Sequence, residues 1–261
     1  MREKEFEAEF IAFRSQLTSY LYRLSANKQD AEDITQDTFL KATEKLDQFK
    51  EKSSLKTWVF SIATNLARDN QRVKNRWVLD AQDACKKAAQ DSSEVEQRII
   101  GAFINQTSKT FDIKEHINYC FTCLGKNLDL EHQLVVILKE VYQFKRSEIA
   151  EIIGKTEGVV KHLLFDGRKE LQERYNNRCA MINKKGVCYQ CAELNDVLQT
   201  AVNGPLDAED KIRSFGFQPM SDVQNLDTRF KIIRKINPLE GNGADLEDTI
   251  LQILRETIHD N

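Results

Sequence analysis

The chain has 261 residues, enough for one large or two small domains. Its 38 basic and 41 acidic side chains give a formal net charge of −3, and it holds only 10 Gly and 3 Pro. This composition excludes a collagen, a fully disordered chain and a Gly/Pro-rich β-sandwich, and it favours an all-α fold because the helix breakers are scarce. The near-zero net charge also excludes a uniformly basic nucleic-acid binder, although it leaves room for local charged patches.

The first residues and the longest apolar run indicate the cellular location of the protein. The start, MREKEFEAEF, has no apolar segment typical of a secretion signal, and the longest aliphatic run is only Val135 to Leu138. A membrane span needs about 20 apolar residues, so we expect a cytoplasmic protein without one. In a reducing compartment, clustered cysteines are more typical of metal binding or redox chemistry than of structural disulfides.

Residues 1–77 are predicted to form a helical unit with two oppositely charged stretches. Residues 29–47 carry six acidic against two basic side chains, whereas residues 50–76 carry seven basic against two acidic ones. A helix is expected from Ser54, which is a suitable N-cap. One face of it is polar and basic, and it is either a solvated surface or a surface for DNA phosphates and bases. Trp58 and Phe60 of the same helix either belong to the core or stack on bases.

A polar, small-residue-rich linker is predicted for residues 78–110, followed by a second helical unit at 111–176. Within that unit, Ala150, Gly154 and Val160 have the spacing of a helix-turn-helix. Ala150 is small where two helices cross, Gly154 permits a left-handed turn, and Val160 docks the second helix. Thr156 is the expected N-cap of that second helix, which such motifs place in the DNA major groove.

Three segments in this order resemble the extracytoplasmic-function (ECF) type sigma factors of bacterial RNA polymerase. Residues 30–49 resemble region 2.2, residues 54–76 resemble regions 2.3 and 2.4, and residues 128–161 resemble region 4. The resemblance implies two helical DNA-binding domains and a C-terminal extension at 177–261. It also implies a function without catalysis, namely binding RNA polymerase core and directing transcription initiation at a subset of promoters.

The resemblance also implies partners and contact residues. The partners are the RNA polymerase core (its β′ and β subunits), promoter DNA and an anti-sigma factor. The implied polymerase contacts lie on the acidic stretch, and the implied DNA contacts lie on the basic helix for the −10 element and on the helix-turn-helix for the −35 element. The polymerase set is Asp33, Gln36, Asp37 and Phe39; the DNA set is Lys56, Asn65, Arg68, Asp69, Arg72, Arg76, Thr156, Lys161, His162 and Arg168.

The second helix of the motif departs from this family. Family members often carry Arg and His where this chain has Leu163, Phe165 and Asp166. Fewer cations predict weaker phosphate anchoring and a shallower salt dependence at the −35 element.

Cysteines near the second unit form a candidate structural zinc site. His116, Cys120 and Cys123 share a helix face, and Cys188 and Cys191 are spaced to supply further ligands. Two alternatives stay open: inert buried thiols and a thiol–disulfide switch. Cys85 has no partner by spacing.

Two other functions compete with the sigma-factor prediction. A helix-turn-helix regulator that acts without joining polymerase core would not need the acidic stretch beside the basic helix. An enzyme has little support, because the sequence lacks a P-loop, a nucleophile elbow and an HExxH motif. The helix expected at residues 245–259 of the extension either packs on the protein itself or binds a regulator.

Overall fold

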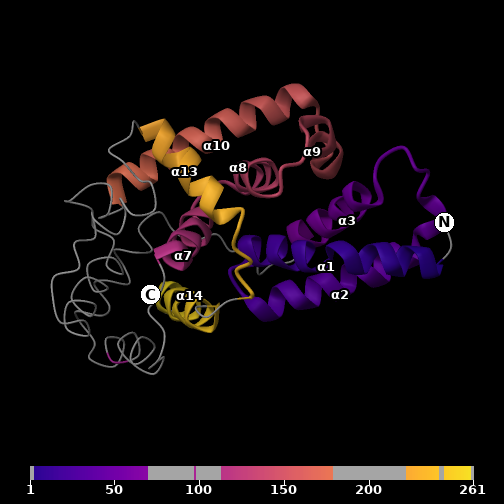
Figure 1. The fold of residues 1–261 in the computed structure, drawn as a ribbon, viewed down its shortest axis with the longest axis horizontal. Coiled ribbons are helices and arrows are strands. Elements are labelled where there is room, and N and C mark those ends of the chain that lie inside the picture. Colours follow the sequence, from indigo (N-terminus) through magenta and orange to yellow (C-terminus); the bar gives the residue numbers. More distant parts are fainter. Residues whose placement is uncertain (1–2, 70–96, 98–112, 179–221, 241–243, 260–261) are drawn as a thin grey trace. The chain divides into compact units, whose positions relative to one another are not determined.

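The computed structural model describes residues 3–69, 97, 113–178, 222–240 and 244–259. Every regular element in these ranges is helical, which confirms the all-α prediction (Figure 1). The elements are α1 (Glu3–Ser25), α2 (Lys28–Glu44), a 3-10 turn (Leu46–Gln48), α3 (Leu55–Asp69), α7 (Ile113–Gly125), α8 (Leu130–Val136), a π-helical turn (Ile137–Val141), α9 (Arg146–Ile153), α10 (Glu157–Arg178), α13 (Asp222–Ile233) and α14 (Ala244–His259). None of the helices described is both long and apolar enough to cross a membrane.

The chain divides into two compact units. The first contains the described residues of 3–69, 125–168 and 237–240, and the second contains those of 113–124, 169–178, 222–236 and 244–259. The sequence places residues 1–77 and 111–176 in separate domains, yet the first unit joins most of both. The helix-turn-helix therefore packs directly on the N-terminal helices.

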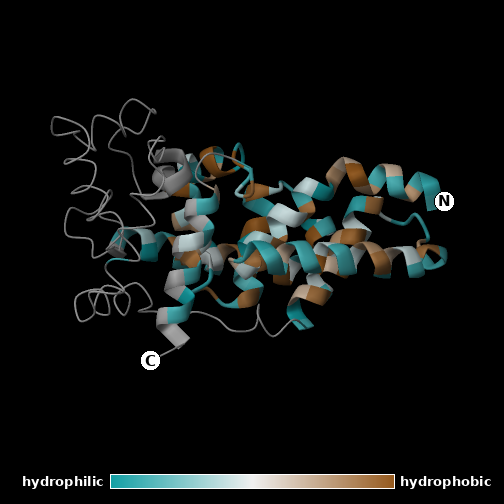
Figure 2. Ribbon diagram, turned by 90° about the horizontal axis from the view of Figure 1, so that it is seen from below, coloured by the Kyte–Doolittle hydropathy of each residue, from teal (hydrophilic) through white to brown (hydrophobic). Residues whose placement is uncertain are grey.

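The N-terminal helices form because their apolar residues recur on one face and their ends are capped. Helices α1, α2 and α3 lie side by side (Figure 1), and teal and brown alternate along them as expected of helices with one apolar face (Figure 2). The Asn27 side chain accepts a hydrogen bond from the Asp30 N–H at 2.7 Å and so begins α2. Ser54 accepts one from the Thr57 N–H at 3.1 Å, which confirms the predicted N-cap.

The helix-turn-helix is built as the sequence predicts. Gly154 has φ +68°, the left-handed conformation that ends α9, and the Lys155 N–H donates to the Ala150 carbonyl at 2.9 Å. The Thr156 hydroxyl accepts the Val159 N–H at 3.3 Å, and Val160 is fully buried. A second glycine matters too, because a Cβ at Gly167 would lie only 2.9 Å from a methyl of Val136. Gly167 thus lets α10 cross closely over α8.

The second unit has its own small core. The rings of Phe121 and Phe230 meet edge to face with centroids 6.0 Å apart, and the Arg229 guanidinium lies 4.5 Å from the ring centre of Tyr175. The segment around Phe230, whose sequence fits a helix or a strand, is helical. The expected terminal helix is confirmed as α14.

Candidate functional site

The predicted polymerase-contacting residues lie on α2, but they do not all face outward. Asp33, Gln36 and Asp37 are exposed. Phe39 is half-buried instead, because its ring packs against Phe6 at 5.6 Å and Phe10 at 5.0 Å between centroids. Three of the four predicted residues therefore form an accessible acidic and polar face, and Phe39 lies beside them, packed against α1.

An apolar residue that the sequence-based set omits shares this face. Leu40 is 52% exposed and follows Asp33 by seven positions and Gln36 by four, which places all three on one side of the helix. We name Asp33, Gln36, Asp37 and Leu40 the α2 face. The i, i+4, i+7 spacing was the available signal, but Phe39 and Leu40 are adjacent apolar residues and only the packing tells which one points outward.

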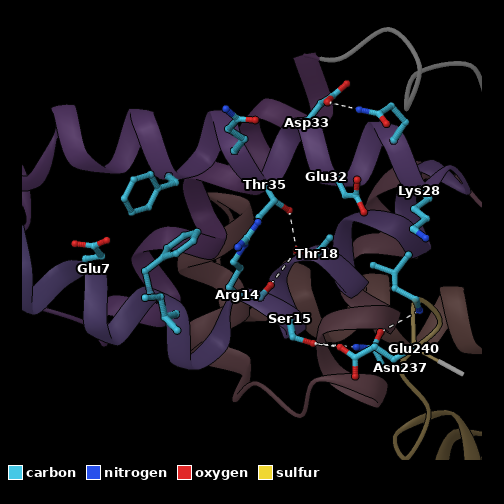
Figure 3. Close-up of a pocket in the computed structure, with 16 residues that line it drawn as sticks. Glu7, Arg14, Ser15, Thr18, Lys28, Glu32, Asp33, Thr35, Asn237 and Glu240 are labelled. Carbon is cyan, nitrogen blue, oxygen red and sulfur yellow. Dashed lines mark hydrogen bonds between the residues drawn. The ribbon is translucent and has the colours of Figure 1, made fainter.

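A groove of about 840 Å³ runs between α1 and α2 beside this face. Its walls carry both charge signs, including Arg14 and Lys28 as well as Asp33. Across it, the Thr35 hydroxyl lies 3.1 Å from the Thr18 hydroxyl (Figure 3).

One rim of the groove is formed by the turn of residues 237–240. There the Ser15 hydroxyl donates to Glu240 Oε1 and accepts from Asn237 Nδ2, each at 2.9 Å (Figure 3). The Leu239 N–H in turn donates to Asn237 Oδ1 at 3.1 Å, which shapes the turn. A short piece of the C-terminal extension is thus attached to α1 beside the α2 face.

The predicted −10 surface on α3 is partly covered. Asn65 and Asp69 are exposed, but the guanidinium of Arg68 is bound from several directions. Its Nε lies 3.1 Å from Glu131 Oε1, and its Nη2 lies 2.8 Å and 3.1 Å from the two oxygens of that carboxylate and 3.1 Å from the Ile153 carbonyl. Arg72 and Arg76 lie outside the described residues. In this conformation Glu131 of α8 and Ile153 of α9 hold the arginine predicted to contact DNA.

Lys56, at the other end of α3, is also engaged. Its ammonium donates to Gln16 Oε1 at 2.6 Å and lies 5.0 Å from the ring centre of Phe144. Partial burial lowers the pKa of Lys56, and nearby Glu148 opposes that shift. Lys56 therefore stabilises the contact between the two halves of the first unit.

Two aromatic residues of α3 have different environments. Phe60 is fully buried, with ring centroids 5.3 Å from Tyr20 and 4.9 Å from Phe144, so it belongs to the core. Trp58 is half-buried and lies 5.2 Å from Phe49 of the preceding loop.

The predicted −35 residues divide into outward and inward groups. Lys161 and His162 are exposed on α10, and Thr156 caps that helix. Arg168 points instead to the π-helical turn, where its Nη1 lies 2.5 Å from Glu140 Oε1 and both side chains are largely buried. Arg168 thus braces α10 in this structure. Phe165, by contrast, lies on the outward side of α10 and is 68% exposed.

The candidate zinc ligands are only partly described. Cys120 and Cys123 are both buried in α7. The side chain of His116, together with Cys188 and Cys191, lies outside the described part of the chain. Among the side chains described, no group of three or more His, Cys, Asp or Glu residues is placed to hold a metal. The zinc site stays a prediction.

Comparison with known proteins shows which proteins the chain resembles. Residues 10–77 match sigma-70 region 2. The chain is 29% identical over 180 residues to the ECF RNA polymerase sigma factor SigG of Mycobacterium tuberculosis, covering 66% of this chain and 49% of SigG. It is 26% identical over 170 residues to the ECF RNA polymerase sigma factor SigW of Bacillus subtilis, covering 62% of this chain and 84% of SigW. The chain thus spans about half the length of SigG.

A solved structure is also similar. The sigma factor RpoE in complex with the anti-sigma factor NepR, from Bartonella quintana, aligns with a TM-score of 0.46 and 24% identity over 65% of this chain and 96% of that one. The region 2 match at residues 10–77 contains the α2 face and the predicted −10 surface of α3. The chain is therefore similar to ECF-type RNA polymerase sigma factors, and its residues 10–77 match their region 2.

Proposed function

We propose that this protein binds RNA polymerase core and directs transcription initiation at a specific subset of promoters, without catalysing a reaction. The observation that carries the proposal is the match of residues 10–77 to sigma-70 region 2, the part of the chain that contains both the α2 face and the α3 surface. A helix-turn-helix follows in the order that two-element promoter recognition requires.

The α2 face is the proposed contact with the polymerase β′ subunit. Asp33 and Asp37 offer negative charge to a basic partner, which speeds and orients association more than it raises affinity. Leu40 adds an exposed apolar side chain between them and the end of the helix. An acidic face with an apolar residue fits a basic partner that has an apolar patch of its own.

The α3 surface and α10 are the proposed contacts with promoter DNA. Asn65 and Arg68 carry the amide and guanidinium groups best suited to bases and phosphates. Because Arg68 is bound to Glu131 of α8 and Ile153 of α9 in the described conformation, contact with the −10 element requires α8 and α9 to release it by moving away from α3. We propose that this opening accompanies binding to the polymerase.

In vitro transcription tests the function. Genomic fragments are transcribed by core polymerase from the same organism with and without the full chain, and new start sites should appear only with it. Arg68→Ala should impair promoter opening while core binding, measured separately by pull-down, stays intact; Arg68→Lys is the matched control that keeps the charge. An absence of new starts together with an absence of core binding would refute the proposal and favour a regulator that acts on its own.

A further inference from the structure

The outward side of α10 carries an exposed aromatic ring, that of Phe165. Phe165 is 68% exposed and is the most exposed of the large hydrophobic side chains among the described residues. Within the first unit, the opposite side of this helix is occupied by Val160 and Gly167, which are buried against the rest of the motif. Packing inside the described motif therefore does not account for the position of Phe165.

Single exposed hydrophobic residues are common on protein surfaces, so the exposure of Phe165 becomes informative only through its neighbours. Lys161 and His162 precede it by four and three positions, so they lie beside it on the same side of the helix, and both are exposed. Gly158 lies one turn before His162 on that side, and a Cβ there would meet only the Thr156 hydroxyl, at 3.8 Å. The N-terminal part of this surface is thus low and carries the Lys161 ammonium, which suits a helix that enters a DNA groove.

Few polar side chains of α10 are available for hydrogen bonds to bases, so an apolar contact with a base becomes important. Arg168 is bound to Glu140 on the inward side, and the Thr156 hydroxyl is used in capping. Asp166, next to Phe165, is exposed and adds a negative charge that DNA phosphates repel. The major groove offers one apolar group to read, the C5-methyl of thymine, and a phenyl ring is a suitable partner for it.

We propose that Phe165 reads the methyl group of a thymine in the upstream promoter element, so that this protein selects for that base by an apolar contact. The inference rests on the proposed function, because it requires α10 to lie in the major groove. Lys161 and His162 then anchor the helix on phosphates or bases on either side of the ring.

Replacement of thymine by uracil tests this contact, because uracil lacks only the methyl group. Holoenzyme reconstituted with the full chain is bound to a promoter fragment found by the transcription test, with each thymine of the upstream element replaced by uracil in turn. We expect about fourfold weaker binding at one position, the value for burying a single methyl group. With Phe165→Ala, thymine and uracil at that position should bind equally well.

Two further variants separate this contact from general weakening. Lys161→Ala should weaken binding to both fragments and keep the fourfold ratio, whereas Phe165→Leu should keep part of that ratio. Because Phe165 is exposed, Phe165→Ala should leave the melting temperature unchanged. Suppose that start sites depend on this protein but uracil has no effect, or its effect persists in Phe165→Ala. That result would overturn the inference about Phe165 and leave the proposed function standing. No promoter complex on either fragment would overturn it together with the proposed function.

Discussion

Replacing Glu131 by glutamine should destabilise the first unit and, at the same time, strengthen its binding to promoter DNA. The carboxylate of Glu131 accepts three hydrogen bonds from Arg68, at 3.1, 2.8 and 3.1 Å, so it occupies the donors that DNA would need. A glutamine at this position would keep the size of the side chain but lose its charge. The two effects therefore have one cause, which is the release of Arg68.

The size of both effects follows from the burial of the pair. The two side chains are 23% and 30% exposed, between the surface pairs that contribute about 0–1 kcal/mol and the buried charged hydrogen bonds that contribute about 1.5–3 kcal/mol. A loss of about 1 kcal/mol corresponds to a fall of about 2–4 °C in melting temperature for a protein of this size. In Glu131→Gln, DNA no longer has to displace this interaction of about 1 kcal/mol, so the variant should bind DNA about fivefold more tightly than the native chain.

Thermal unfolding and fluorescence anisotropy of the full chain with a single-stranded −10 oligonucleotide measure the two effects. Glu151→Gln is the matched control, because Glu151 is exposed on α9 and its replacement removes the same charge. An equal gain in DNA affinity for both variants would mean that net charge alone is responsible. No gain for Glu131→Gln would mean that its contact with Arg68 does not compete with DNA, which would refute the reasoning.

The remaining predictions concern the α2 face, a glycine, two tyrosines and the cysteines. Asp33→Asn with Asp37→Asn should weaken core binding in a pull-down and leave the melting temperature unchanged, whereas Glu44→Gln on the same helix should not weaken it. Gly167→Ala should cost about 1–3 kcal/mol of unfolding free energy in chemical denaturation, because the added methyl would lie 2.9 Å from Val136; Gly158→Ala, whose added methyl would meet only the Thr156 hydroxyl at 3.8 Å, is its control. Burial raises the pKa of both Tyr20 and Tyr142, so the folded chain keeps these phenols protonated. The free energy of unfolding should therefore fall as the pH rises above about 10, where the tyrosines of the unfolded chain ionise. Chemical unfolding curves at pH 8 to 11 should show a smaller fall for Tyr142→Phe than for the native chain. If the predicted zinc site forms, the purified chain should contain one zinc by mass spectrometry and lose it in Cys120→Ser, and a metal-free native chain would remove that prediction.

Local features of this fold were predictable because each depends on few residues. The cap at Ser54 and the left-handed turn at Gly154 follow from one side chain or from its absence. The spacing of Ala150, Gly154 and Val160 likewise predicts two helices that cross, and the structure has them. Such features are determined within a turn or two of the chain.

Features that depend on distant partners were not predictable from the same sequence. The close approach at Gly167 depends on the position of Val136, and the packing of Phe39 rather than Leu40 against α1 depends on the rings of Phe6 and Phe10. The packing of α9 on α3, which joins the two predicted domains into one unit, likewise depends on residues far apart in sequence. Periodicity places residues on a face, but it does not say which other face they meet.

Arg68 illustrates how the two kinds of information combine. The resemblance to sigma factors implies that Arg68 contacts DNA, and the planar fork of donors of its guanidinium suits phosphate and base acceptors. A carboxylate presents two acceptor oxygens in much the same geometry, so Glu131 satisfies Arg68 as a phosphate would. The chemistry that makes this arginine a predicted DNA contact therefore also explains why it binds an acid from α8 in this structure. The residue type predicts the kind of ligand, and we expect the protein's own acid and promoter DNA to compete for it.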